Sequence, residues 1–346
     1  MTAPTDFASA ARLLRAARTP EQVFGADPQA ATAIYRALAK LVHPDRVGAD
    51  EAAAAHAAFA TLSALWSARP GHRTVTAPSG TYRVGERLAA DDVADYLDAT
   101  TGTTPVLLKV VRRPADNDLL HGEAAALRRV AANVRPEHRA YLPRLRDAFT
   151  HRDRDSGADR AVAVYDRLDG FVSLAAVRDA VPHGLDARDV AWMWRRLLVA
   201  IGVAHRAGVV HGAVLPEHVL IEPREHGLVL VGWTYAATGK AGRVPAMVGR
   251  YRDWYPPEVP ARAPATAATD IYLATRCVLA LMGDRAPQAL RQFARGCLLR
   301  PPAARPQDAW RLLTELDGRL EQIFGPRRFR PFALPATVPA WPRHTT

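Results

Sequence analysis

The chain has 346 residues, 49% of them hydrophobic and 23% charged, which is the composition of a globular protein with room for about two domains. The formal charge is +11, but the 46 basic residues are scattered and form no motif that reads nucleic acid, so nucleic acid is not an expected partner. Two cysteines, Cys277 and Cys297, are too few for a disulfide framework, and no apolar run reaches the roughly 18 residues that span a bilayer, so we expect a cytoplasmic protein without a membrane partner.

Three segments near the N-terminus carry apolar side chains at helical spacing, which predicts helices over about 6–18, 28–42 and 50–68. Their apolar side chains are Phe7, Ala11, Leu14 and Ala17 in the first, Ala31, Ile34, Leu38 and Leu41 in the second, and Ala55, Phe59, Leu62 and Trp66 in the third. The second segment contains no acidic residue and places Arg36 and Lys40 four apart on its polar side. A basic amphipathic helix is therefore followed by an apolar one.

The tripeptide His43-Pro44-Asp45 stands between these two helices. This order of a helix, a basic helix, His-Pro-Asp and an apolar helix resembles the J domain of DnaJ-type co-chaperones. The resemblance implies a DnaK-type chaperone as partner, whose ATP hydrolysis the tripeptide would trigger, while Arg36 and Lys40 add complementary charge at the contact. The sequence departs from the family because it lacks the usual aromatic pair near the end of the first helix. The residues alone also allow a plain capped turn, in which Pro44 ends one helix and Asp45 bonds to the backbone.

A change from helical to strand patterns follows. Residues 69–81 are rich in Pro, Gly, Ser and Thr, which is typical of a linker. Strands are predicted at 82–85, 105–111 and 160–165, and a helix is predicted over 119–132.

Residues 209–221, with the sequence VVHGAVLPEHVLI, consist of an apolar lead, a short loop and a resumed strand. They resemble the catalytic loop of the protein-kinase fold, whose pattern is H-R-D-x-x-x-x-N. His211 stands at the first position of that pattern, but Ala213 stands at the base position and His218 at the metal-holding position. A methyl group cannot accept the proton of a substrate hydroxyl, so the loop predicts kinase architecture without kinase chemistry. We expect His211 to face the core and His218 to lie at a solvent edge.

Lys109 matches the strand lysine that a kinase pairs with nucleotide phosphates, and Glu123 matches the helix glutamate that binds this lysine. The pair either holds a nucleotide or is a structural ion pair that aligns helix and sheet. The second interpretation is favoured, because residues 88–97 contain no glycine that would bring the backbone close to phosphate oxygens. Asp91 and Asp92 in that segment would also repel phosphates.

Later positions of the kinase pattern match its scaffold better than its chemistry. Gly232-Trp233-Thr234 stands in the place of Asp-Phe-Gly, where Trp233 can be an apolar plug but Gly232 cannot ligate magnesium. Glu258 and Arg305 match the ion pair that closes the activation segment, and Asp270 matches the aspartate that braces the catalytic loop. We therefore expect buried scaffold contacts at these three residues.

The expected fold is multidomain: an all-α J-like helical hairpin followed by a two-lobed α+β kinase-like fold. The expected boundaries are 1–70 for the J-like domain, 71–81 for a linker, 82–322 for the kinase-like domain with a small lobe at 82–165 and a large lobe at 170–322, and 323–346 for a Pro/Arg-rich tail. This tail is expected to be solvated or pinned to the surface, with binding to a partner as the alternative.

The leading functional hypothesis is a non-enzymatic adaptor, in which the J-like domain recruits a DnaK-type chaperone and the kinase-like domain binds a client or regulatory protein. It assigns no catalytic residue, no metal and no cofactor, with at most weak binding of ATP. The first alternative is an atypical Ser/Thr kinase in which Glu217, Asp91, Asp92 or Glu225 takes over metal binding. The second is a nucleotide sensor that binds ATP without turnover.

Overall fold

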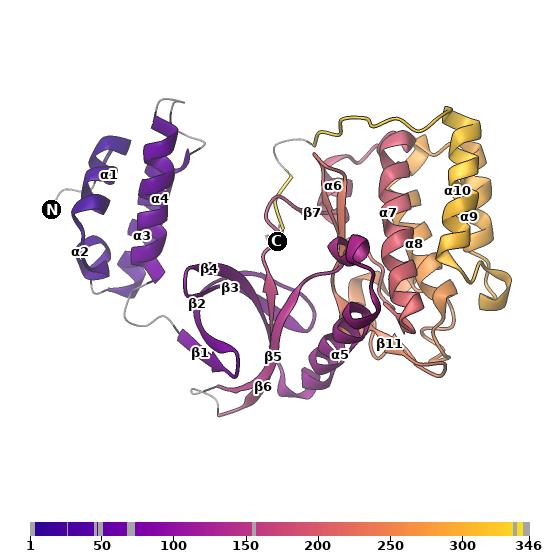
Figure 1. The fold of residues 1–346 in the computed structure, drawn as a ribbon, viewed down its shortest axis with the longest axis horizontal. Helices are drawn as coiled ribbons and strands as arrows, with labels where there is room; N and C mark the ends of the chain where they lie inside the picture. The colour runs from indigo at the N-terminus through magenta and orange to yellow at the C-terminus, as the bar shows by residue number, and fades with distance from the viewer. Residues whose placement is uncertain are drawn as a thin grey trace. The chain divides into compact units, whose positions relative to one another are not determined.

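The structure, a computed structural model, describes residues 4–25, 27–44, 47, 51–67, 73–153, 157–334 and 338–341. Within these residues the chain forms two compact units. The first contains the residues up to Thr76 together with Gly80–Gly85 and Thr100–Gly102 (Figure 1). The second contains Ala77–Ser79, Glu86–Ala99 and the residues from Thr103 onward.

The helices of the first unit pack around a small aromatic and aliphatic core. They are α1 (Phe7–Ala16), α2 (Pro20–Phe24), α3 (Pro28–Val42) and α4 (Ala52–Ser67). The ring of Trp66 lies 5.1 Å from that of Phe24 and 4.6 Å from that of Tyr35, so one indole joins three of the helices. The sequence did not predict α2, because five residues are too few to show a helical period. This helix is started instead by Pro20 at its first position and by Gln22, which accepts the N-cap N–H at 3.3 Å.

A single sheet forms most of the small lobe. Its strands, as far as the chain is described, are β1 (Arg73–Ala77), β2 (Gly80–Ala90), β3 (Ala94–Thr101), β4 (Thr104–Val111), β5 (Leu145–Arg152) and β6 (Asp159–Asp166), in the order β1-β2-β3-β4-β6-β5. β4 and β6 are antiparallel, with Lys109 opposite Ala163. Helix α5 (Asn117–Asn133) packs against β5 and β6 and carries Glu123 towards Lys109.

The prediction of a linker at 71–81 is wrong over the described part of that segment. Residues 73–77 form β1, and β2 begins at Gly80. The β-branched side chains of Thr74, Val75 and Thr76 favour an extended backbone. The Pro, Ser and Gly that indicated a linker therefore mark the turn between two neighbouring strands.

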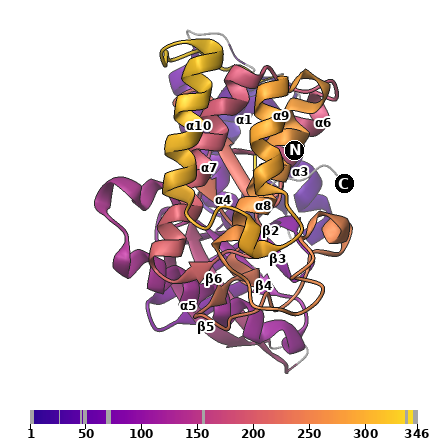
Figure 2. The ribbon, with the colours of Figure 1, turned by 90° about the vertical axis from the view of Figure 1, so that its right-hand side faces the viewer.

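Helices dominate the large lobe. Its elements are α6 (Leu174–Ala180), α7 (Ala187–Arg206), α8 (Ala267–Met282), α9 (Gln288–Cys297) and α10 (Ala309–Phe324), with the short strands β7 (Val172–Ser173), β8 (Val209–Val210), β9 (Val219–Glu222), β10 (Gly227–Leu230) and β11 (Ala237–Thr238). Helices α7 to α10 stand side by side and contact one another (Figure 2). β9 pairs with β10 and with β7, so the strand that the sequence predicted to resume at the end of residues 209–221 is present. The tail begins after Phe324, slightly later than the predicted boundary.

The fully buried side chains of α7 form the centre of the large-lobe core. They include Trp194, Leu197, Leu198 and Ile201, which recur at helical spacing and therefore lie on one face of the helix. Both cysteines are buried free thiols in this core. Burial raises the pKa of each thiol, that of Cys297 to about 11, so neither is a reactive thiolate. In the described part of the chain, no helix combines the length and apolar character needed to cross a bilayer.

Candidate functional site

Lys109 and Glu123 meet in the buried centre of the second unit. Their side chains are 1% and 3% exposed, and the Lys109 Nζ lies 2.7 Å from the Glu123 Oε2. The same ammonium donates to the hydroxyl of Thr234 at 2.6 Å, and the Glu123 Oε1 accepts the Tyr165 hydroxyl at 2.6 Å. The structure thus brings together the two residues that the sequence paired. It adds Thr234 and Tyr165. Their only sequence signals were that Thr234 ends the triplet at 232–234 and that Tyr165 ends the strand predicted at 160–165.

Asp91 lies in the turn between β2 and β3 and directs its carboxylate towards Lys109. Its Oδ2 is 3.6 Å from the Lys109 Nζ and accepts the Tyr96 hydroxyl at 2.8 Å. Its Oδ1 accepts the N–H groups of Val93 at 2.8 Å and Ala94 at 2.7 Å. Loop N–H groups and a lysine ammonium are the donors with which kinases bind nucleotide phosphates. In this chain a carboxylate of the protein itself accepts them.

The charges of this cluster stabilise one another. Burial opposes ionisation of Asp91, but the ammonium of Lys109 and the backbone donors outweigh it and hold the pKa of Asp91 below its ordinary value. Burial also disfavours the charged form of Lys109, yet Glu123 and Asp91 raise its pKa. Burial, together with these carboxylates, raises the pKa of Tyr96 well above its ordinary value, so its phenol remains a donor. Two carboxylates face one ammonium, and a polyphosphate would meet net negative charge there.

His211 is a neutral residue of the core, where the sequence predicted it. It is fully buried, and burial lowers its pKa. Its Nε2–H donates to the Val231 carbonyl at 2.9 Å, and its Nδ1 accepts the Ala213 N–H at 3.3 Å. The ring also meets Trp233 edge-on at 4.8 Å. Both ring nitrogens are engaged by backbone groups, so His211 supports the loop and offers no base to a substrate.

The prediction that His218 lies at a solvent edge is wrong, because its side chain is only 6% exposed. Its Nδ1–H donates to the Ala213 carbonyl at 2.8 Å, and its ring stacks on Tyr235 at 5.8 Å. A Cβ added to Gly232 would stand 2.5 Å from the His218 ring. The imidazole therefore fills space that the glycine leaves open. Burial lowers the pKa of His218 to about 3, so this ring is neutral.

The residues that a kinase with substituted metal ligands would need do not converge. Glu217 forms an ion pair with Arg250, Asp92 accepts the Gly249 N–H at 3.1 Å, and Glu225 is exposed in the turn after β9. Over the described ranges, no group of three or more His, Cys, Asp or Glu side chains is arranged to hold a metal ion.

Asp270 holds the backbone of the loop at 209–221. It is fully buried at the start of α8. Its Oδ2 accepts the His211 N–H at 2.8 Å and lies 2.8 Å from the His205 Nε2, while its Oδ1 accepts the Gly212 N–H at 2.8 Å. The loop is therefore fixed through its backbone, which does not depend on catalytic side chains.

Glu258 and Arg305 form a buried bidentate ion pair. The Arg305 Nη1 and Nη2 lie 2.7 Å and 3.0 Å from the two Glu258 carboxylate oxygens. Thr269 donates its hydroxyl to the same carboxylate at 3.0 Å, and Arg305 also donates to the Arg300 carbonyl at 2.8 Å. Each charge is thus paired and hydrogen-bonded, which is what burial of an ion pair requires.

Trp341 from the C-terminal tail lies in the cleft beneath the small lobe. It packs on Leu220 of β9, Val229 of β10 and Val231 directly after β10. The free space between Trp341, Tyr96, Glu123 and Gly232 is about 20 Å³, which is room for about one water molecule. The kinase pattern ends before this residue, and the sequence did not single it out.

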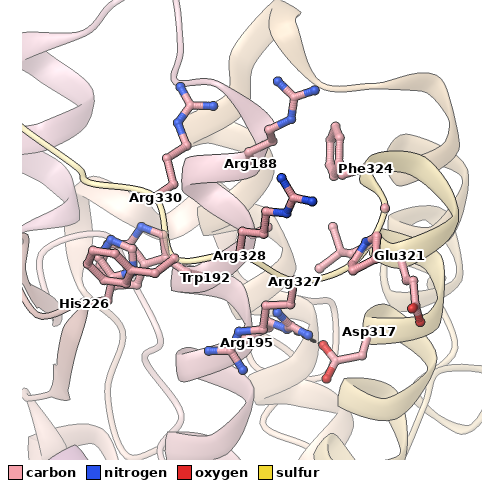
Figure 3. Close-up of a pocket in the computed structure, with 15 residues that line it drawn as sticks. Arg188, Trp192, Arg195, His226, Asp317, Glu321, Phe324, Arg327, Arg328 and Arg330 are labelled. Atoms are coloured by element: carbon pink, nitrogen blue, oxygen red, sulfur yellow. Dashed lines mark hydrogen bonds and ion pairs between the residues drawn. The ribbon is translucent and has the colours of Figure 1, made fainter.

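A second cavity, of about 780 Å³, lies between α7, α10 and the tail (Figure 3). Its lining includes Arg188, Arg195, Arg327, Arg328 and Arg330 with the carboxylates of Asp317 and Glu321. The site residues predicted from the sequence are absent from the lining that the structure describes for this cavity. The C-terminal tail crosses this cavity and contributes part of its lining.

The described residues predicted to contact a chaperone lie on α3 and directly after it. His43 is exposed, with its ring 5.6 Å from that of Phe59, and Pro44 is half-buried. Arg36 and Lys40 are exposed on α3. Asp45 lies outside the described residues.

Comparison with known proteins gives matches to kinases. The sequence profile of the lipopolysaccharide kinase (Kdo/WaaP) family matches residues 110–231. A search of curated proteins finds no match. Vaccinia related kinase 3 is similar in structure, with a TM-score of 0.57 and 15% identity over 74% of this chain and 92% of that one. The BubR1 kinase domain is similar with a TM-score of 0.55 and 14% identity over 72% of this chain and 83% of that one.

Such low identities establish the fold and not the activity. The matches do not support a J domain in the first unit, where the structure has helices of the predicted type. They do support the predicted kinase-like fold, and the second unit has the two-lobed α+β fold of the protein kinases.

Proposed function

We propose that the kinase-like domain is a binding module that does not transfer phosphoryl groups. The observation that carries this proposal is the Asp91 carboxylate, which uses the loop N–H groups and the Lys109 charge that would bind nucleotide phosphates. A phosphate group entering there would have to displace a carboxylate whose pKa is already lowered by the same donors.

The chemistry of phosphoryl transfer is also missing at its other positions. Ala213 has no group that accepts a proton, and loss of a general base alone typically lowers a rate by about 100- to 10,000-fold. Gly232 offers no ligand to magnesium, and the imidazole of His218 is buried against it. Because phosphoryl transfer depends on metal-held charge and positioning, these losses compound.

Radiolabel transfer from MgATP to a generic protein substrate tests the proposal. The wild-type chain is expected to give no more transfer than Lys109→Ala, since neither has a functional set of catalytic groups. Transfer that Lys109→Ala abolishes, in a preparation whose Asp91→Asn variant is more active still, would identify an enzyme that Asp91 restrains.

The second part of the proposal concerns the first unit, which we assign to recruitment of a DnaK-type chaperone, so that the whole chain is an adaptor for a client or regulatory protein. Its support is local: exposed basic residues on α3 lead to an exposed His43 at the start of the turn. Stimulated ATP turnover by a DnaK-type chaperone is the measurement. Asp45→Asn should abolish stimulation, whereas Glu51→Gln, which removes a nearby exposed carboxylate, should preserve it. Equal stimulation by Asp45→Asn would remove this assignment.

A second candidate function, an atypical kinase or nucleotide sensor, is favoured by the Lys109–Glu123 ion pair and by the match to a lipopolysaccharide kinase family. The kinase matches speak for this candidate more directly than for a co-chaperone role. It predicts a thermal shift of the wild-type chain with MgATP, which Lys109→Ala abolishes. If millimolar MgATP does not change the melting temperature, both the atypical kinase and the nucleotide sensor are excluded.

A further inference from the structure

The tail is attached to the large lobe before it reaches the cleft. After α10 it crosses the cavity beside α7 (Figure 3). The Arg330 guanidinium pairs there with Asp189 at 3.1 Å and with Asp186 at 3.7 Å. The ring of Phe329 stacks on that of His226 at 4.6 Å. His226 stacks in turn on Trp192 of α7 at 4.2 Å, nearly parallel. This part of the tail is therefore held on the protein surface, which is one of the two states expected from the sequence.

Further along, Phe332 is 8% exposed and packs edge-on to Trp192 at 6.0 Å. Leu334 and Val338 also pack against the main core. Successive contacts of this kind hold Trp341 close to the cleft, so its entry is an intramolecular event with a high effective concentration.

Within the cleft, Trp341 makes both polar and apolar contacts. Its backbone N–H donates to the Phe171 carbonyl at 2.8 Å. Its indole lies on the apolar floor formed by Leu220, Val229 and Val231, and meets the Tyr96 ring of the small lobe edge-on at 5.9 Å. A half-buried aromatic group thus contacts residues of both lobes.

We propose that this cleft is a receptor for an indole side chain, and that Trp341 occupies the place at which a nucleotide base would enter. The proposal rests on the proposed function and extends it, because it names what the non-catalytic cleft binds. Phe171 lies in the hinge between β6 of the small lobe and β7 of the large lobe, and its carbonyl receives the hydrogen bond of the tail.

Two groups of the chain then cover the two ends of the cleft. Asp91 accepts the phosphate-binding donors near Lys109, and Trp341 fills the apolar part near the hinge. They come from opposite ends of the domain in the sequence, and Tyr96 contacts both, Asp91 through its hydroxyl and Trp341 through its ring. Single and double variants therefore measure what each group contributes. The remaining space of about 20 Å³ admits no base beside the indole.

Binding to the full-length chain and its variants tests this proposal. Trp341→Ala should leave an apolar space of indole shape, and an apolar cavity of that kind binds small aromatic molecules. We expect free indole and adenosine to bind this variant at least about tenfold more tightly than wild type, measured by titration calorimetry. Both ligands should also raise its melting temperature. Trp310→Ala removes a half-buried tryptophan of α10 outside the cleft and should gain no adenosine affinity.

The two ends of the cleft give a second comparison. MgATP should bind Trp341→Ala no better than adenosine does, because Asp91 still rejects the phosphates. The double variant Trp341→Ala/Asp91→Asn should bind MgATP at least about tenfold more tightly than Trp341→Ala. A well-folded Trp341→Ala with wild-type affinity for both indole and adenosine would overturn the proposal.

Hydrogen exchange of the wild-type chain decides the matter if Trp341→Ala does not fold. The Trp341 amide, bonded to the Phe171 carbonyl, should exchange at least about tenfold more slowly than an unprotected peptide. Unprotected exchange would place the tail outside the cleft and reject the receptor. Phosphoryl transfer by wild type would reject the proposed function alone, whereas failure of Trp341→Ala to gain ligands would reject only the indole receptor.

Discussion

The contacts around Asp270 and Glu258 and the positions around Gly232 lie in one domain but follow opposite rules. At Asp270 and Glu258 the residue types of the kinase pattern are present, and each carboxylate is paired within 3.0 Å. At Ala213, His218 and Gly232 the residue types differ from the pattern, and the new groups pack on one another.

This difference teaches which part of a kinase pattern determines the fold. The paired carboxylates bind backbone and guanidinium groups that would otherwise be buried without partners, so their loss is costly. The catalytic positions bind a substrate or metal only, so other side chains can replace them without loss of the fold. A chain with the first set and without the second should therefore be stable and inactive.

The largest effect is expected for Arg305→Ala. It leaves the Glu258 carboxylate buried without its cation, which costs about 3–5 kcal/mol of unfolding free energy. Urea unfolding measures this cost if the recorded signal reports on the kinase-like domain alone. The matched control is Arg311→Ala, which breaks an exposed pair with Glu315 on α10 and should cost less than about 0.5 kcal/mol. Similar losses for both variants would show that burial does not separate scaffold pairs from surface pairs.

Restoring a metal ligand should be the next most costly change. Gly232 has φ of 77°, and a Cβ there would collide with the His218 ring, so Gly232→Asp should lose at least about 2 kcal/mol. The double variant Gly232→Asp/His218→Asn removes the collision and should be less destabilised than the sum of its single variants. Thermal unfolding of the four chains measures the coupling. Strict additivity would mean that the two positions do not exclude each other.

Acid should destabilise the domain through His218. Its pKa is about 3 in the folded chain against an ordinary value of 6.5, so the unfolded chain binds the proton between these values and stability falls as pH falls. From pH 6.5 to pH 5 this one group accounts for a loss on the order of 1 to 2 kcal/mol. His218→Asn should lose that much less over the same interval in urea unfolding. His183→Asn, at an exposed histidine, should keep the wild-type pH dependence. A wild-type slope in His218→Asn would show that the imidazole is not held neutral.

Sequence reasoning predicted well wherever a motif couples two distant residues. Lys109 with Glu123, and Glu258 with Arg305, meet as expected, because their spacing in the kinase pattern implies contact. Asp270 likewise lies against the loop of His211. Helical periods also predicted α3 and α4 to within a few residues.

The misses have physical reasons. His218 was predicted to lie at a solvent edge, but it is buried. Its ring fills the space beside Gly232, and the sequence does not reveal that the fold brings these two residues together. Thr234 and Tyr165 join the Lys109 cluster through hydroxyl groups, which carry no periodic or charge signal. Trp341 lies beyond the pattern, and the described residues of the tail around it form neither helix nor strand that a period could predict.

The smallest expected effect on stability is that of the double variant Arg36→Ala/Lys40→Ala in the first unit. Both side chains are exposed on α3, so their removal should change the free energy of unfolding by less than about 0.5 kcal/mol. The melting temperature should change correspondingly little. If they guide a DnaK-type chaperone, the association rate should fall several-fold, and the rate should also lose part of its salt dependence. Stopped-flow binding at two ionic strengths measures both quantities. Arg15→Ala removes an exposed arginine of α1 as the control, and an equal loss of rate in that variant would mean that total charge, not the surface beside His43, attracts the partner. In that case, the burial of a charge would determine its effect on stability, but the position of an exposed charge would not determine its effect on binding of the chaperone.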